Sequence, residues 1–78
     1  MSNNIELKLS RENVGQVLDC LEYAAEDWAR TRVYHESGEF DFEAGPVREC
    51  NDAYEAGQIE ASYNRIIEEI RKQLARQV

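Results

Sequence analysis

The chain has 78 residues, of which 42% are hydrophobic, and its 16 acids and 9 bases give a formal net charge of −7. A chain of this length forms one domain whose single core supplies only about 3–5 kcal/mol of stability, so we expect a further source of stability such as self-association. No apolar run approaches the ~18 residues that a membrane span needs, which predicts a soluble, cytoplasmic protein that does not contact a membrane.

The first segment, residues 1–9, is predicted to be a short extended N-terminal arm. Ile5, Leu7 and Leu9 alternate with Glu6 and Lys8, as they would in a strand. Five alternating residues without a certain partner favour an arm that lies across the helices.

A long amphipathic helix is predicted from about residue 10 to residue 36. Ser10 is a suitable N-cap, and Gly38 supplies the flexible residue that commonly follows a helix C-terminus. Apolar residues recur at helical spacing along one stripe, and Cys20 at its edge is interpreted as a small core residue. The residues of the stripe are Val14, Val17, Leu18, Leu21, Ala24, Ala25 and Trp28.

The opposite side of this helix carries two tyrosines and an ion pair at helical spacing. Tyr23, Asp27, Arg30 and Tyr34 follow each other at steps of four, three and four. Aromatic residues and arginine are enriched in protein interfaces, so these four are candidates for binding a partner. The alternative is an ordinary surface pair, with the tyrosines on solvent or under the connector.

The apolar stripe turns polar at its C-terminal end, where Arg32 and His35 lie on it. The simpler interpretation is that these two residues mark the end of the core. The alternative is a site for a small anionic or nucleotide-like ligand, or for a metal ion held with Glu36, Glu39 or Asp41. No second histidine or nearby cysteine completes a ligand set, so we expect no metal.

The connector, residues 37–51, is predicted to be irregular and strongly acidic. Phe40 and Phe42 either fold back to cap the core or form an acidic, aromatic motif that binds a partner. Pro46 suits the first turn of a short helix that continues through Val47 to Cys50.

The charge is concentrated around this connector. Residues 36–55 carry seven acids and one base, whereas residues 1–35 carry six acids and four bases, and residues 56–78 carry three acids and four bases. Phosphates would be repelled by the acidic segment, so we expect no direct binding of nucleic acid. A basic surface on another protein is the more suitable partner.

A second amphipathic helix is predicted from about residue 52 to residue 77, with Asp52 and Glu55 as a weak capping box. Gly57 either permits close approach of the first helix or delays the start of the regular helix. The apolar stripe consists of Ala56, Ile59, Tyr63, Ile66, Ile67, Ile70 and Leu74.

Together these elements predict an all-α fold, an antiparallel helical hairpin that assembles into a dimeric four-helix bundle. Leu18 and Ile67 lie at the flanks of the stripes and are too large to be buried by two helices alone. A compact monomer, closed by the arm and the connector, is the competing structure. The predicted self-association seam consists of Val14, Leu18, Leu21, Trp28, Tyr63, Ile67, Ile70 and Leu74.

No catalytic signature accompanies this architecture, and we expect neither an enzyme nor a cofactor. His35 is the one histidine, and the sequence has no Gly-rich phosphate loop, Cys-x-x-Cys or His-Glu-x-x-His. The chain is similar in size and character to the short, acidic, helix-rich proteins of bacteriophage and mobile elements. We therefore predict an interaction protein, an inhibitor or adaptor that could mask a basic nucleic-acid-binding site, with a ligand-binding oligomer or a purely structural subunit as alternatives.

Overall fold

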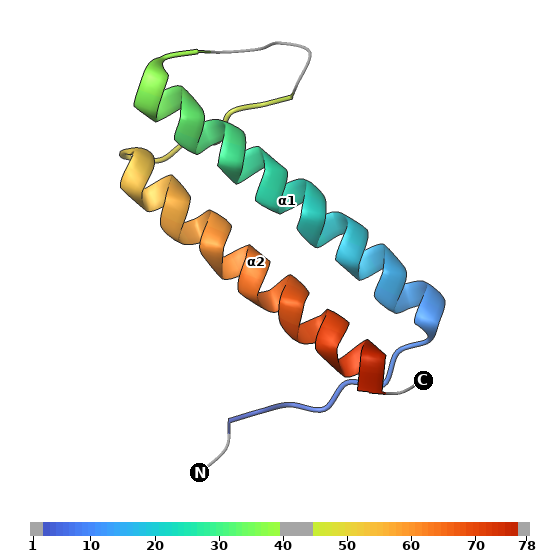
Figure 1. The fold of residues 1–78 in the computed structure, drawn as a ribbon. Coiled ribbons are helices and arrows are strands. Elements are labelled where there is room, and N and C mark those ends of the chain that lie inside the picture. The colour runs from blue at the N-terminus through green and yellow to red at the C-terminus, as the bar shows by residue number, and fades with distance from the viewer. Residues whose placement is uncertain (1–2, 40–44, 77–78) are drawn as a thin grey trace.

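The computed structural model describes residues 3–39 and 45–76 and contains two helices within these ranges, α1 (Arg11–Ser37) and α2 (Ala53–Arg76), with no strand. The helices run antiparallel and side by side, and the connector joins them at one end (Figure 1). The predicted all-α helical hairpin is therefore confirmed. Both helices begin and end within one residue of the predicted positions.

The ends of α1 are set by local hydrogen bonds, as predicted. Ser10 has extended backbone angles, and its hydroxyl accepts a hydrogen bond from the Asn13 backbone N–H at 3.1 Å. At the other end, Gly38 has a φ of 75°, and its N–H donates to the Tyr34 carbonyl at 2.7 Å. Glycine adopts this left-handed conformation without steric cost, which explains why the helix stops here.

The start of α2 uses half of the predicted capping box. The Glu55 backbone N–H donates to Asp52 Oδ1 at 2.8 Å. The Glu55 carboxylate does not complete the box but accepts a hydrogen bond from Asn51 Nδ2 at 2.9 Å. Gly57 lies inside a continuous α2, and a Cβ atom added there would lie 3.3 Å from Arg32 Cδ, so this glycine permits close approach of α1.

Two glycines within the helices, Gly15 and Gly57, allow a matched comparison of glycine-to-alanine substitutions. Gly15→Ala should raise the free energy of unfolding by about 1 kcal/mol, because alanine is the better helix former and a Cβ there meets nothing within 4 Å. Gly57→Ala should gain less, because the Arg32 side chain must move to admit the methyl group. Urea denaturation measures both, and an equal or larger gain at Gly57 would contradict the close approach.

The described part of the connector, residues 45–51, contains no helix, so the predicted short helix through Pro46 and Cys50 is wrong. The reason is a contact with α1. The Arg48 backbone N–H donates to Thr31 Oγ1 at 2.8 Å, and the Arg48 guanidinium binds Asp27 Oδ2 at 2.9 Å. The connector is therefore held along α1. Phe40 and Phe42 lie outside the described residues.

The core between the helices is small. Among the described residues, the buried ones are Ala25, Thr31, Ala56 and Ile67. Ile67 is 5% exposed, so the prediction that two helices cannot bury it is wrong. Cys20, predicted as a core residue, is exposed. The rest of the predicted seam is half-buried, namely Val14, Leu18, Leu21, Trp28, Tyr63, Ile70 and Leu74.

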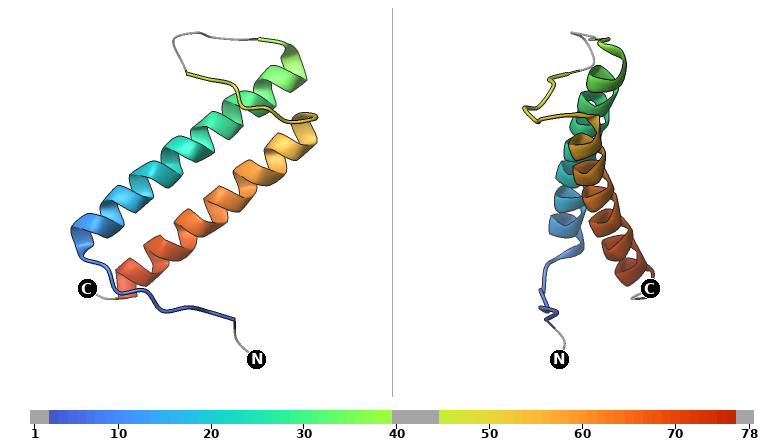
Figure 2. Two further views of the ribbon diagram at one scale, coloured as in Figure 1. Left: turned by 180° about the vertical axis from the view of Figure 1, so that it is seen from behind. Right: turned by 90° about the vertical axis from the view of Figure 1, so that its left-hand side faces the viewer.

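The hairpin forms a thin layer rather than a compact body. Its principal extents are 43 × 33 × 17 Å, and the edge-on view on the right of Figure 2 shows α2 in front of α1, with the arm and the described connector leaving the layer on the same side. The arm is highly exposed, with Ile5 at 83% and Leu7 at 77%. Neither described helix combines the length and hydropathy required to span a membrane.

Candidate interaction surfaces

The two sides of the helical layer differ in chemistry, and one of them is apolar. Two grooves share Leu9 and Val17 and are therefore continuous; we call their combined surface, together with Ile66, the apolar face. Ile66 lies one helical turn before Ile70 on the side of α2 that carries Gln73. The first groove is lined by Leu9, Asn13, Gln16, Val17, Cys20, Leu21, Ala24 and Tyr63. The second is lined by Ile5, Leu7, Lys8, Leu9, Val14, Val17, Ile70, Gln73 and Leu74.

Large apolar side chains remain exposed on this face. Val17 is 41% exposed, Ile66 is 45% exposed and Leu9 is 51% exposed. A contiguous exposed apolar surface of this kind is uncommon on a stable monomer and marks a site of association. Residues 3–39 and 45–76 therefore leave part of this face exposed, although the arm lines one end of it.

The opposite side, which we call the polar face, is closed by ion pairs between the helices. Cys20 and Glu22 are two residues apart, or about 200° around α1, so the groove beside Glu22 opens on the other side of the layer. Arg71 of α2 binds Glu22 there, and Arg32 Nε binds Glu60 Oε1 at 2.9 Å. The groove on this face is lined by Glu22, Ala25, Glu26, Ala29, Glu60, Asn64, Ile67 and Arg71.

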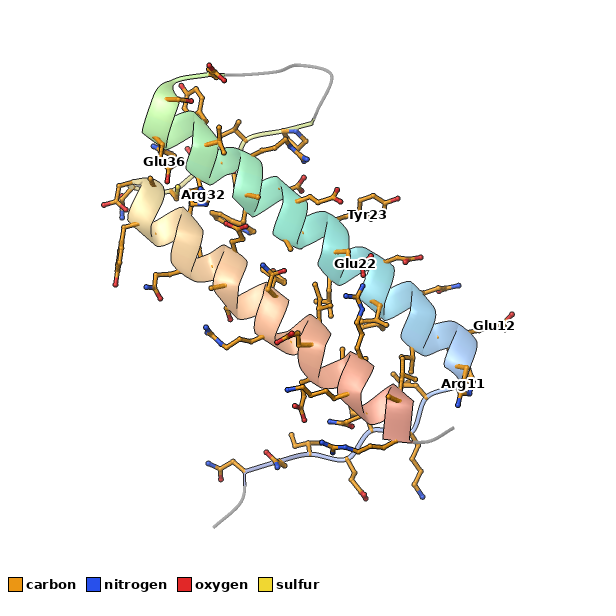
Figure 3. The ribbon with its side chains drawn as sticks, in the orientation of Figure 1. Arg11, Glu12, Glu22, Tyr23, Arg32 and Glu36 are labelled. Atoms are coloured by element: carbon orange, nitrogen blue, oxygen red, sulfur yellow. The ribbon has the colours of Figure 1, made fainter. Side chains whose placement is uncertain are left out.

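Arg32, one of the two predicted ligand-binding residues, is bound by carboxylates of the chain itself. Besides Glu60 it contacts Glu36 Oε1 at 3.4 Å, and Figure 3 shows Arg32 and Glu36 together at the connector end of the hairpin. Its hydrogen bond to the Glu60 carboxylate, followed by the attraction of that charge, raises the pKa of Arg32 above its ordinary value. An anionic ligand would therefore compete with two carboxylates of the chain for this guanidinium.

His35, the other predicted ligand-binding residue, does not join Arg32 around a common site. It is exposed, and its ring meets the Tyr34 ring edge-on with the centroids 5.5 Å apart. Within residues 3–39 and 45–76, no three His, Cys, Asp or Glu side chains come together in a group that could hold a metal ion. At the connector end of the hairpin, the apolar stripe of α1 is therefore followed by the interhelical ion pair of Arg32 with Glu60.

The predicted partner surface on the back of α1 is divided between two roles. Asp27 binds both Arg30 and Arg48, so the ion pair of this surface also holds the connector. The tyrosines are turned outward, with Tyr23 69% exposed and Tyr34 40% exposed. Figure 3 shows Tyr23 pointing away from α2. The two exposed tyrosines thus lie on either side of Asp27, whose carboxylate binds arginines of the chain itself.

Thr31 was missed by the sequence interpretation and is the centre of the connector contact. Its side chain is fully buried, its hydroxyl donates to the Asp27 carbonyl at 2.8 Å, and it accepts from the Arg48 N–H. Gly45 of the connector lies against the Arg30 side chain, where an added Cβ would lie 2.6 Å from Arg30 Nη2. The sequence offered one indication of this role, a threonine at the edge of the apolar stripe. A threonine there is not distinguishable from one at an ordinary position on a helix surface.

This geometry predicts the effect of removing the Thr31 hydroxyl. Thr31→Val keeps the shape of the side chain but leaves the Arg48 N–H without its acceptor, so it should lower the free energy of unfolding by about 1–3 kcal/mol. Thr31→Ser retains the hydroxyl and should cost less. Urea denaturation monitored by circular dichroism compares the variants, and a neutral Thr31→Val would show that the connector is not held by this bond.

Comparison with known proteins does not assign the chain to a family. No protein-family model, curated protein or solved structure matches it. The apolar face, the polar face and the connector contact are therefore the observations from which a function has to be proposed.

Proposed function

We propose that the chain is a small cytoplasmic interaction module that self-associates as a dimeric four-helix bundle and acts by binding another protein, as an inhibitor or an adaptor. The observation that carries the proposal is the contrast between a very small core and an exposed apolar face. Ala25, Ala56 and Ile67 are the buried apolar residues among those described, whereas Val17 and Ile66 remain open to solvent. A second hairpin would supply the missing burial.

The reducing conditions of the cytoplasm suit the two cysteines. Both Cys20 and Cys50 are free, and the Cys50 thiol donates to the Asp52 carbonyl at 3.5 Å. Disulfides are the usual staple of small proteins in oxidising compartments, whereas a protein of this size in a reducing compartment gains stability from assembly instead.

Self-association is tested by the mass of the protein in solution. Light scattering after size exclusion should give twice the 9.0 kDa of the chain at micromolar concentration. Circular dichroism should show unfolding midpoints that rise with protein concentration, because subunit association and folding are linked. A mass of one chain at these concentrations would overturn this part of the proposal.

A protein with a basic surface is the partner that the charge distribution favours. Residues 36–55 carry seven acids and one base. The base, Arg48, is neutralised by Asp27 within the chain, while Glu36, Glu39 and Glu49 are exposed. Among the described acids of this segment, Glu39 and Glu49 are thus left to act outward, because Glu36 contacts Arg32, Asp52 caps α2 and Glu55 binds Asn51. The nucleic-acid-binding site of another protein has the complementary charge.

The partner proposal is tested by the salt dependence of binding. A protein captured from a lysate of the native host in low salt should dissociate as salt rises, because exposed charges are screened. A variant with Glu36, Glu39 and Glu49 changed to Gln should no longer capture this protein. The matched control changes Glu12, Glu68 and Glu69 to Gln and removes the same charge elsewhere. Equal binding by the two variants, or binding insensitive to salt, would contradict an acidic contact.

A further inference from the structure

We infer that the apolar face is covered by the same face of a second copy, and that the two hairpins stack with their connectors at opposite ends of the dimer. This inference rests on the proposed self-association and adds to it the face that is used and the orientation of the copies. Three observations carry it: the chemistry of the two faces, the surface area of the chain and the position of its charges.

The chemistry of the faces selects the apolar one. Covering the polar face would remove the Glu22–Arg71 and Arg32–Glu60 pairs from water, and the desolvation of ion pairs offsets much of their attraction. Covering the apolar face removes exposed Val17 and Ile66 from water instead, which is favourable in proportion to the area. The polar face is therefore the one left in solvent.

The surface area of the chain matches what a dimer of this kind needs. The accessible surface is 6474 Å². A compact monomer of 9.0 kDa is expected to expose about 4,900 Å², so the chain has an excess of about 1,600 Å². If each copy buries an area of this order, the total lies in the range of roughly 2,000–5,000 Å² that is found for obligate homodimers.

A second copy suits the face because the face contains both large and small side chains. It combines large side chains, such as Tyr63 and Leu21, with small ones, such as Cys20 and Ala24, in one groove. A two-fold interface brings the same patch together from both copies, so large residues can meet small ones across it. Four half-buried helices would then enclose one core.

The charges decide the orientation. The described residues of the connector end, 36–39 and 45–55, carry five acids and one base and sum to −4, whereas residues 3–14 and 68–76, at the other end, carry four acids and five bases and sum to +1. The described part of the connector leaves the layer on the same side as the arm, and arm residues line the apolar face (Figure 2). Two connectors at the same end would place −4 beside −4, whereas opposite ends place −4 beside +1, so repulsion favours the second arrangement.

The orientation has a measurable consequence at Tyr54, which lies in the first turn of α2 and is 75% exposed. The lining residues of the apolar face run from Asn13 to Ala24 on α1 and from Tyr63 to Leu74 on α2, so the face is centred near the level at which Glu22 and Arg71 pair. Tyr54 is therefore about 26 Å along the helix from the centre, at 1.5 Å per residue. The two Tyr54 positions are about 52 Å apart if the connectors lie at opposite ends and about 25 Å apart if they lie together.

The experiment measures distances between pairs of spin labels in the intact protein. Native cysteines are first replaced (Cys20→Ala, Cys50→Ser), and a single label is attached at Tyr54→Cys or, as the reference, at Asn64→Cys on the polar face. Circular dichroism and light scattering check the fold and mass of each labelled protein. Apolar faces in contact place the Asn64 labels about 25–35 Å apart, whereas polar faces in contact place them within about 15 Å.

Each outcome is decisive. A dimer with about 32 Å between Asn64 labels and more than 40 Å between Tyr54 labels supports the inference. A short Tyr54 distance would overturn the orientation, and an Asn64 distance below 15 Å would overturn the choice of face, while self-association itself would stand. Monomers in the unlabelled natural sequence would instead refute the proposed self-association, on which the inference rests.

Discussion

Val17→Glu should dissociate the dimer, whereas Val33→Glu should leave it intact. Both residues are valines of α1 and both are 41% exposed, so the two substitutions add the same charge at equally accessible positions. They are sixteen residues apart, which places them about 160° apart around the helix. Val17 lines both grooves of the apolar face, and Val33 points away from it.

The expected effect is large because a two-fold interface contains the substitution twice. Burying an unpaired carboxylate costs several kcal/mol, and even about 2.7 kcal/mol corresponds to a hundredfold weaker association. Sedimentation equilibrium over a range of concentrations measures the dissociation constant, and circular dichroism checks the helix content. Dissociation by Val33→Glu with no effect of Val17→Glu would place the interface on the other side of the hairpin.

Ile67→Ala should lower the free energy of unfolding by about 2–5 kcal/mol, the usual cost of truncating a buried isoleucine. Ile67 is the one large apolar side chain that is buried among the described residues, at 5% exposure. Its loss leaves a cavity in a core whose other buried apolar residues, among those described, are Ala25 and Ala56. In a protein of this size, that loss approaches the whole stability of the core.

A graded series separates this effect from a general response to mutation. Ile67→Val should cost about 0.5–1.5 kcal/mol, and Val33→Ala, at an exposed position on α1, should stay within about 0.5 kcal/mol of the natural sequence. Urea denaturation at one fixed protein concentration compares them. A loss below 1 kcal/mol for Ile67→Ala would show that the hairpin contact contributes little and that stability resides elsewhere.

The ends of the helices could be predicted because they depend on neighbours in the chain. The Ser10 cap, the Gly38 stop and the Asp52 cap each involve bonds over three or four residues. The apolar stripes also follow from local periodicity. Which positions of a stripe are buried and which are exposed was harder to predict, as Ile67 and Cys20 show. The reason is that the rotation of each helix about its axis depends on the other helix.

The candidate surfaces divide in the same way. The outward position of Tyr23 followed from helical spacing alone. The contact of Arg48 with Thr31 spans seventeen residues. It could not be predicted from helical spacing, because nothing in the sequence position of either residue indicates the other. This contact displaced the short helix predicted near Pro46, and it engages Asp27, which spacing alone had offered to a partner.

Two helices, their caps, their apolar stripes and an acidic connector can be predicted from the amino-acid sequence, because each depends on side chains within one helical turn or on the sum of charges. That ion pairs close one side of the layer while the other side stays apolar became apparent only from the packing of α1 against α2. That difference arises from contacts such as Arg32 with Glu60, which form only when α1 and α2 are brought side by side. The apolar face is the result of that pairing.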